Sequence, residues 1–270
     1  MLQRAISSIR NSSKALIHII TVVNGTRADG KTCDWLKRQC DIQLLYVATP
    51  SAPGAVQAGR QLVQSEFFSC LDDDDEHLSG ATDAKVSALM LDKEAYLVVT
   101  NAYRCLSGVD RLMYSNLSGM PVRPLENLMR FNCFHNGNAL FRSAAVDPSY
   151  FDNYHQYADW TWLAFRLVMD GKRVAVLDIP TFRYNDTDGS LSKSRACRNS
   201  YMPVFQRIVD RSPPPHIMKI IRHKLGAAYH DASDAALVAG LRGVAWGYHL
   251  MSLVHTGGLK YLSYTRNLFK

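Results

Sequence analysis

The chain has 270 residues, of which 47% are hydrophobic and 20% are charged, and its formal net charge is +7. This composition is that of an ordinary globular protein, with room for one large domain or one domain with an appendage. A signal peptide is excluded because Arg4 and Arg10 interrupt the N-terminal apolar residues, and every apolar stretch is too short or too broken to span a bilayer. The six cysteines form no CxxC pair, which indicates a reduced, cytoplasmic protein.

Helix and strand patterns alternate through the first hundred residues. Apolar residues at helical or strand spacing predict helices over 3–13, 54–63 and 83–91, and strands over 16–23, 44–47, 67–71 and 95–100. This alternation predicts an α/β fold of the Rossmann-like kind, with a mostly parallel sheet covered by helices on both faces.

The rest of the chain is less regular at first. Residues 101–157 are rich in Gly, Pro, Asn and Ser, which predicts loops with a short hairpin or two. After them we expect a helix over 158–169, a strand over 174–179, a polar loop over 181–195 and, beyond the prolines of 212–215, two or three helices. We therefore divide the chain into an α/β domain, residues 1–200, and a basic helical appendage, residues 201–270.

Four consecutive aspartates, Asp72 to Asp75, follow directly on the strand predicted at 67–71. Ligands of open α/β sheets bind where strands leave the sheet. Carboxylates this close stay ionised together only if water or a cation neutralises their repulsion. Mg²⁺ and Mn²⁺ prefer oxygen ligands and are shared between one or two carboxylates and a phosphate. The run therefore predicts either a metal-bridged phosphate site or a solvated acidic turn that stabilises the next helix.

An ordered series of motifs over roughly residues 2–192 resembles the family 2 glycosyltransferases, which have the nucleotide-sugar-binding GT-A fold. Asn24-Gly25-Thr26, with Asp29 just after it, looks like the first nucleotide-contacting turn of that family. Residues 54–66 look like its Gly-x-x-x-Ala-Arg-Asn-x-Gly helix, and residues 67–75 are similar to the strand that ends in its Asp-x-Asp motif. Ala158-Asp159-Trp160 matches its Glu-Asp-Trp region.

The resemblance implies an inverting transfer of a sugar from a nucleotide sugar of the UDP type to an acceptor hydroxyl. It implies that Asp72 and Asp74 hold a Mg²⁺ or Mn²⁺ ion, with Asp74 in direct contact and Asp72 or Asp73 near the ribose. The residues that would contact the rest of the nucleotide are Asn24, Gly25, Asp29 and Gln57. Val56 and Gln57 stand where the family often has Arg and Asn.

Asp159 is the candidate general base, because the acceptor hydroxyl must lose a proton as it attacks and a carboxylate with a modestly raised pKa can take it. The alternative is that Asp159 only stabilises the first turn of its helix. Trp160 lies on the apolar stripe of this helix and is predicted to be a core residue. Trp162 lies off the stripe and is predicted to reach the acceptor.

Two departures limit what the resemblance implies. Thr187 stands where many members have a metal-binding histidine, so no third metal ligand is identified. The family's first strand, which normally lies between those predicted at 16–23 and 67–71, is missing, and its absence would leave backbone hydrogen bonds unmade inside the sheet. We expect either a shortened chain or, as the alternative function, a degenerate member that binds a glycan or protein partner without catalysis. A nucleotidyltransferase would need a Gly-rich basic signature near the first strand, and none is found.

Residues 201–270 carry +6 of the net charge, with nine Lys and Arg against three Asp and Glu. The stretch 235–254 is apolar enough to lie on a membrane surface, and the alternative is an appendage packed on the domain. The resemblance implies a glycan or lipid-linked acceptor in bacterial surface polysaccharide synthesis, which suits peripheral contact at the inner face of the membrane. We expect no nucleic-acid binding, because basic and aromatic residues do not interleave as in the known motifs.

Overall fold

The computed structural model describes residues 1–117, 119–187 and 189–269. The chain divides into two compact units, one of residues 1–128 with 132–188 and the other of residues 129–131 with 189–270. The boundary expected between residues 200 and 201 lies inside helix α7 (Arg195–Asp210).

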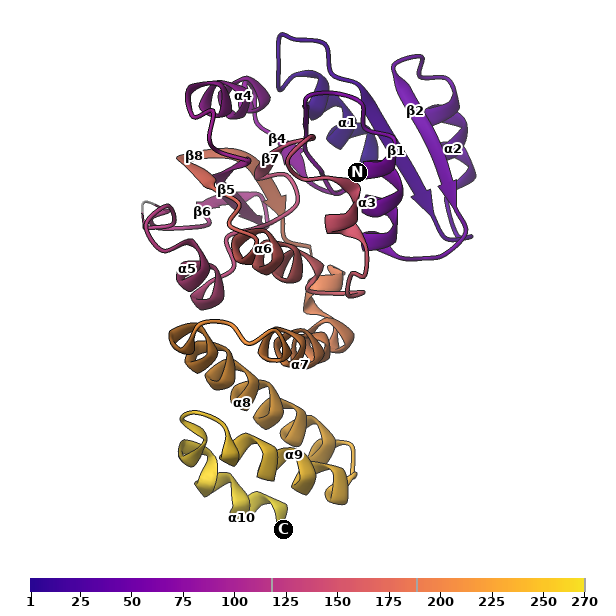
Figure 1. Cartoon of the computed structure of the whole chain (residues 1–270). Coiled ribbons are helices and arrows are strands. Elements are labelled where there is room, and N and C mark those ends of the chain that lie inside the picture. Colours follow the sequence, from indigo (N-terminus) through magenta and orange to yellow (C-terminus); the bar gives the residue numbers. More distant parts are fainter. Residues whose placement is uncertain (118, 188, 270) are drawn as a thin grey trace. The chain divides into compact units, whose positions relative to one another are not determined.

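The helices and strands of the chain are labelled in Figure 1. The strands are β1 (Ile19–Asn24), β2 (Ile42–Val47), β3 (Phe67–Phe68), β4 (Glu76–His77), β5 (Leu97–Leu106), β6 (Val109–Leu112), β7 (Ala139–Arg142) and β8 (Val174–Asn185). The α-helices are α1 (Leu2–Arg10), α2 (Gly30–Lys37), α3 (Ala52–Gln61), α4 (Ala81–Leu91), α5 (Pro124–Arg130), α6 (Asp159–Met169), α7, α8 (Pro215–Val238), α9 (Arg242–Val254) and α10 (Thr265–Leu268). Short 3-10 helices are η1 (Pro148–Phe151), η2 (Leu191–Lys193) and η3 (Gly258–Tyr264).

Strands β1 and β2 form a parallel two-stranded sheet between helices. Ile6 of α1, Ile19 of β1 and Leu36 of α2 share one small core on one face. Helix α3 packs closely on β1, because Gly59 has no side chain: a Cβ there would lie 3.3 Å from Cγ2 of Val22. This part of the first unit is therefore a small α/β layer with its own two-stranded sheet.

The other strands form a six-stranded sheet in the order β3-β7-β5-β8-β4, with β6 paired to β5. The predicted α/β class is confirmed, but the pairing is mixed rather than mostly parallel. Strands β5 and β8 are parallel, whereas β3–β7, β5–β7, β4–β8 and β5–β6 are antiparallel. Three of these pairs involve β6 or β7 of the stretch 101–157, for which loops with a short hairpin or two were predicted. The β5–β6 pair is such a hairpin.

Each face of the large sheet has its own core. Leu89 of α4 packs with Val98 of β5 and Leu140 of β7 on one face. Aromatic rings gather around Phe141 of β7: its centroid lies 4.9 Å from that of Phe68 and 6.4 Å from those of Phe151 and Trp160. Helix α6 and η1 thus join β3 and β7 through stacked and edge-on rings.

In the described part of the chain, β1 pairs only with β2, and β3 pairs only with β7. The strands predicted at 16–23 and 67–71 therefore do not pair with each other. Helix α3 contacts both sheets, since Gly59 lies against Val22 while the Arg60 guanidinium lies 4.4 Å from the ring centre of Phe68.

Two strand predictions need correction. The strand expected at 67–71 is only Phe67–Phe68, because the residues after it leave the sheet edge. Strand β8 continues to Asn185, through the start of the polar loop expected at 181–195. Its polar end pairs with β5 up to Cys105, and the Arg183 guanidinium forms an ion pair with Asp110 at 2.7 Å.

The second unit is helical, as predicted for the residues beyond the prolines. Ala236 of α8, Ala245 of α9 and Leu268 of α10 are buried together in its core. Among the described residues, none of the helices combines the length and hydropathy that a membrane-spanning helix requires.

Candidate active site

The acidic run Asp72 to Asp75 lies in the connection from β3 to β4, which are the two opposite edge strands of the large sheet. Hydrogen bonds hold the run from two sides. Asn136 Nδ2, just before β7, donates to Asp72 Oδ1 at 2.5 Å. At the end of β8, Asn185 donates its backbone N–H to Asp75 Oδ1 at 2.8 Å and its Nδ2 to the carbonyl of Asp74 at 2.7 Å. The run is therefore a fixed part of the fold.

The four carboxyl groups lie close together and differ in exposure: Asp72 and Asp73 are exposed, Asp74 is half-buried and Asp75 is buried. Burial, with the negative charges of its neighbours, raises the pKa of Asp75 to about 8, although the Asn185 N–H opposes the shift. Burial also raises the pKa of Asp72 to about 6, and burial with the charge of Asp73 raises the pKa of Asp74. Asp75 is 1% exposed, and the next element is strand β4, so the run does not stand at the start of a helix.

These carboxylates suit a hard divalent cation, whose charge would relieve their repulsion. Within the described residues, no group of three or more His, Cys, Asp and Glu side chains is arranged to hold a metal ion. An ion that also binds a diphosphate needs only one or two carboxylates from the protein. Asp72 and Asp74 therefore fit such an ion in chemistry and charge, and Asp73 next to them is exposed.

Lys85 of α4 is completely buried behind this loop, and its role was not foreseen from the sequence. Its Nζ donates to the carbonyl of Gly137 at 2.8 Å, and burial lowers the pKa of Lys85 to about 7. Gly137 follows Asn136, which holds Asp72. The pattern Ala81, Lys85, Leu89, which are all buried at four-residue spacing, is a signal that could have revealed an inward-facing lysine.

Asp159 is the first residue of α6 and follows Ala158, which has a positive φ of 55°. Burial raises the pKa of Asp159 to about 7, and the negative charge of Asp72 adds to the shift. The two carboxyl groups are thus close enough to influence each other. The structure brings together Asp72 and Asp159, which lie far apart in the sequence.

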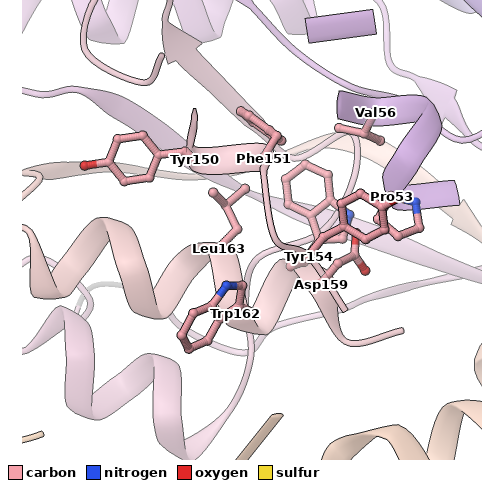
Figure 2. Close-up of a pocket in the computed structure, with 9 residues that line it drawn as sticks. Pro53, Val56, Tyr150, Phe151, Tyr154, Asp159, Trp162 and Leu163 are labelled. Atoms are coloured by element: carbon pink, nitrogen blue, oxygen red, sulfur yellow. The ribbon is translucent and has the colours of Figure 1, made fainter. Parts of the chain in front are cut away.

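Figure 2 shows a pocket beside Asp159, with Pro53 and Val56 of α3 on one side and Tyr154 close to the carboxyl group. Trp160 and Trp162 both line this pocket, but Trp162, which was predicted to lie off the packed face of α6, is the more buried of the two. Trp162 is 2% exposed and stacks on Phe165, whereas Trp160 is only partly buried. The prediction failed because α6 is buried on most sides from Thr161 to Leu167, so a single apolar stripe does not define its inner face.

The nucleotide-contacting candidates lie at the carboxyl ends of β1 and β2. Asn24 is the last residue of β1, and Gly25 follows it and donates its N–H to the carbonyl of Val47 at 2.8 Å. Asp29 caps α2, since its Oδ2 accepts from the Thr32 N–H at 2.8 Å. In the described residues none of these three hydrogen-bonds with the acidic run.

Gln57 of α3 lines a second, more polar pocket. Its Nε2 donates to Asp152 Oδ1 at 2.6 Å. The other lining residues are Val47, Thr49, Ser51, Gly54, Ala58, Gln61 and Tyr154. Because Val47 also binds Gly25, this pocket adjoins the end of β1.

A comparison with protein families adds to this geometry. The model of glycosyl transferase family 2 matches residues 1–158. The chain belongs to this family. It is a glycosyltransferase, and the resemblance seen in its sequence motifs is confirmed. A comparison with curated protein sequences found no match.

Solved structures with a similar fold include several of TarS from S. aureus. The structure of TarS residues 1–349 with UDP-GlcNAc has a TM-score of 0.64 and 12% identity, over 93% of this chain and 77% of TarS 1–349. TarS residues 1–349 with UDP have a TM-score of 0.57 and 12% identity, over 89% and 70% of the two chains. A longer TarS structure has a TM-score of 0.58 and 12% identity, over 83% of this chain and 40% of its own. At this identity the likeness establishes the fold.

Proposed function

We propose that this glycosyltransferase moves a sugar from a UDP-linked nucleotide sugar to a hydroxyl of a glycan or lipid-linked acceptor, with inversion at the anomeric carbon. The observation that carries the proposal is that Asp72 lies within electrostatic reach of Asp159, whose pKa it helps to raise, because one carboxylate at the donor side and one at the acceptor side are what this reaction needs. The fold likeness to TarS, which has been crystallised with UDP-GlcNAc and with UDP, supports this donor class.

Asp159 is the proposed general base. Its carboxylate accepts the proton of the acceptor hydroxyl while that oxygen attacks the anomeric carbon. The bond from the anomeric carbon to the β-phosphate oxygen breaks, and the nucleoside diphosphate leaves with the electron pair. A single displacement of this kind inverts the configuration. A pKa of about 7 suits a base at neutral pH.

Asp72 and Asp74 are the proposed ligands of a Mg²⁺ or Mn²⁺ ion, which when bound would stabilise the charge that develops on the diphosphate. Asn136 fixes the orientation of the Asp72 carboxylate for this role. We propose that Asp72 or Asp73 also lies near the ribose, and that Asn24, Gly25, Asp29 and Gln57 contact the rest of the nucleotide.

We further propose that the acceptor belongs to bacterial surface polysaccharide synthesis and that the reaction takes place in the cytoplasm, at the inner face of the membrane. The six cysteines are free thiols, which supports a reducing compartment. The aromatic side chains that line the pocket beside Asp159, among them Tyr154 and Trp160, support a sugar acceptor, because sugars stack on aromatic rings.

Two measurements on the whole chain test the proposal. Calorimetry should show UDP binding that requires Mn²⁺ and that Asp74→Asn weakens at least about tenfold. With a UDP-sugar and an acceptor, Asp159→Asn should lower kcat by about 10²–10⁴ while UDP binding stays the same. Asp92→Asn, which removes a surface carboxylate paired with Arg173, is the matched control and should change neither value.

Absence of metal-dependent UDP binding would instead favour the non-catalytic alternative, a member that binds a glycan or protein partner. The separation of the β1–β2 sheet from the large sheet is the observation behind that alternative. Unchanged turnover in Asp159→Asn would remove Asp159 as the base and leave the donor assignment standing.

A further inference from the structure

The solvent-facing side of helix α9 is apolar along its whole length. Ala245, His249 and Ser252 of this helix face the core of the second unit and are buried. The opposite side contains only Gly243, Val244, Gly247, Leu250, Met251 and Val254, all of them exposed. These residues recur at spacings of three and four, so they form one continuous surface, which we call the α9 face.

An outward helix face of a water-soluble bundle is normally polar. Here Val254 is 75% exposed and Leu250 56% exposed, and no charged side chain lies among the six residues of the α9 face. Exposed apolar residues also occur in the neighbouring segments, at Val238, Leu241, Leu259, Leu262 and Phe269. A contiguous apolar surface of this kind marks a site that another molecule covers.

The charges around the α9 face identify the kind of molecule. From Ala235 to Lys270 the sequence has four basic residues and no Asp or Glu. Arg242 begins α9, and Lys260 and Arg266 are exposed on the segments that follow it. Helix α9 and the segments that follow it thus carry basic but no acidic side chains, although Asp231 and Asp234 of the neighbouring helix α8 are exposed and the Tyr264 hydroxyl donates to Asp234 Oδ1 at 3.0 Å. An apolar face on such a basic segment matches an anionic lipid surface, where apolar side chains enter the interface and basic ones meet the headgroups. A second copy of this chain would bring the same positive charges against one another.

We propose that the α9 face docks peripherally on an anionic lipid bilayer. The inference goes beyond the transfer reaction and does not depend on it, because it uses only residues of the second unit. It gives the enzyme a direct route to acceptors that are anchored in a membrane.

The test is flotation of the full chain with phosphatidylcholine vesicles, with or without phosphatidylglycerol. The unmodified protein should float with the anionic vesicles at low salt, and added salt or omission of phosphatidylglycerol should reduce the bound fraction. The double variant Met251→Glu, Val254→Glu should bind at least about tenfold less, because it places two carboxylates on the α9 face. Both side chains are exposed, so the variant should fold, which circular dichroism would verify.

Leu91→Glu is the matched control, since Leu91 is an 89% exposed apolar residue at the end of α4 in the first unit. It should float as the unmodified protein does. The proposal is overturned if no binding to anionic vesicles occurs at low salt, or if the double variant binds as well as the control. It is also overturned if the double variant abolishes a dimer seen by light scattering while vesicle binding is absent, since the occupant would then be a second copy.

Discussion

The raised pKa of Asp159 should make the rate of sugar transfer depend on pH. Burial and the charge of Asp72 raise its pKa to about 7, so its carboxyl group is mostly protonated in mild acid. A general base must be ionised, and therefore kcat/KM should rise about tenfold per pH unit below pH 7 and level off above it. A pH profile with an acceptor that does not titrate in this range would measure this. A rate independent of pH across that range would contradict the role of Asp159.

Lys85 should give the stability of the protein a measurable dependence on pH. Its folded-state pKa of about 7 is lower than the ordinary value of 10.5, so between these values the unfolded chain binds more protons than the folded one. Lys85 therefore makes the protein more stable as pH rises from 7 towards 10.5. Below pH 7 and above pH 10.5 its contribution no longer changes with pH, because both states then bind the same number of protons at this group.

Lys85→Met removes this contribution and leaves the Gly137 carbonyl without its donor, which costs about 1–3 kcal/mol. The melting temperature of the variant relative to the unmodified protein should therefore fall further at pH 9 than at pH 7. Lys93→Met, at an exposed lysine just after α4, is the control and should show no such trend. A constant difference for Lys85→Met would mean that Lys85 stays protonated in the fold.

The turn before β7 is an element on which the acidic run depends. Gly137 has a φ of +87°, and a Cβ there would lie 2.7 Å from Cδ2 of Phe182 and 3.0 Å from Cδ1 of Leu71. Gly137→Ala should therefore displace Asn136 from Asp72 and weaken metal-dependent UDP binding at least about tenfold, beyond its cost in stability. Gly108→Ala has a similar φ of +81° with open space around it, so it reports the backbone strain alone. Equal UDP binding by both variants would show that the turn does not position Asp72.

Elements with a strong repeating pattern could be predicted from the sequence. The α1, α3, α4 and α6 helices and the β1 and β2 strands lie where apolar periodicity indicated, within a few residues. Strand β5 begins where it was predicted but continues to Leu106, past the predicted end at residue 100. Strand β7 could not be predicted, because its four residues follow a glycine turn and their pairing with β3 and β5 depends on distant parts of the chain. The bounds of β3 and β4 could not be predicted either, because a strand of two residues shows no alternation of apolar and polar side chains.

The candidate site could be predicted only in part. Sequence order placed Asp72 after a strand and Asp159 at a helix start, which is where they lie. The effect of Asp72 on the pKa of Asp159 could not be predicted, because the two residues approach each other only in the folded chain. The same holds for the hydrogen bonds of Asn136, Asn185 and Lys85, which come from the turn before β7, from β8 and from α4. The burial of Trp162 could not be predicted either, since α6 is buried on most sides and its apolar stripe does not mark a single inner face.

At the scale of the whole molecule, the two units should unfold separately. Leu89 is completely buried in the first unit, and Leu268 is 2% exposed in the core of the second. Either residue replaced by alanine should lose about 2–5 kcal/mol from its own unit. Calorimetry should show two transitions, with Leu89→Ala lowering one and Leu268→Ala lowering the other. A single transition that both variants shift equally would mean that the units unfold as one.

The unpaired edge of β1 has a consequence for the dynamics of the chain. In a parallel pair, alternate residues direct their backbone groups towards the same neighbour, and the Gly25 N–H is directed to Val47 of β2. The alternate residues of β1 direct their N–H groups to the opposite edge of the strand, where no strand pairs with β1 among the described residues. Amide hydrogen exchange should therefore alternate along β1, slow at one residue and fast at the next. The residues whose amides exchange fast would be those with unpaired backbone groups, and another extended chain could form hydrogen bonds with them.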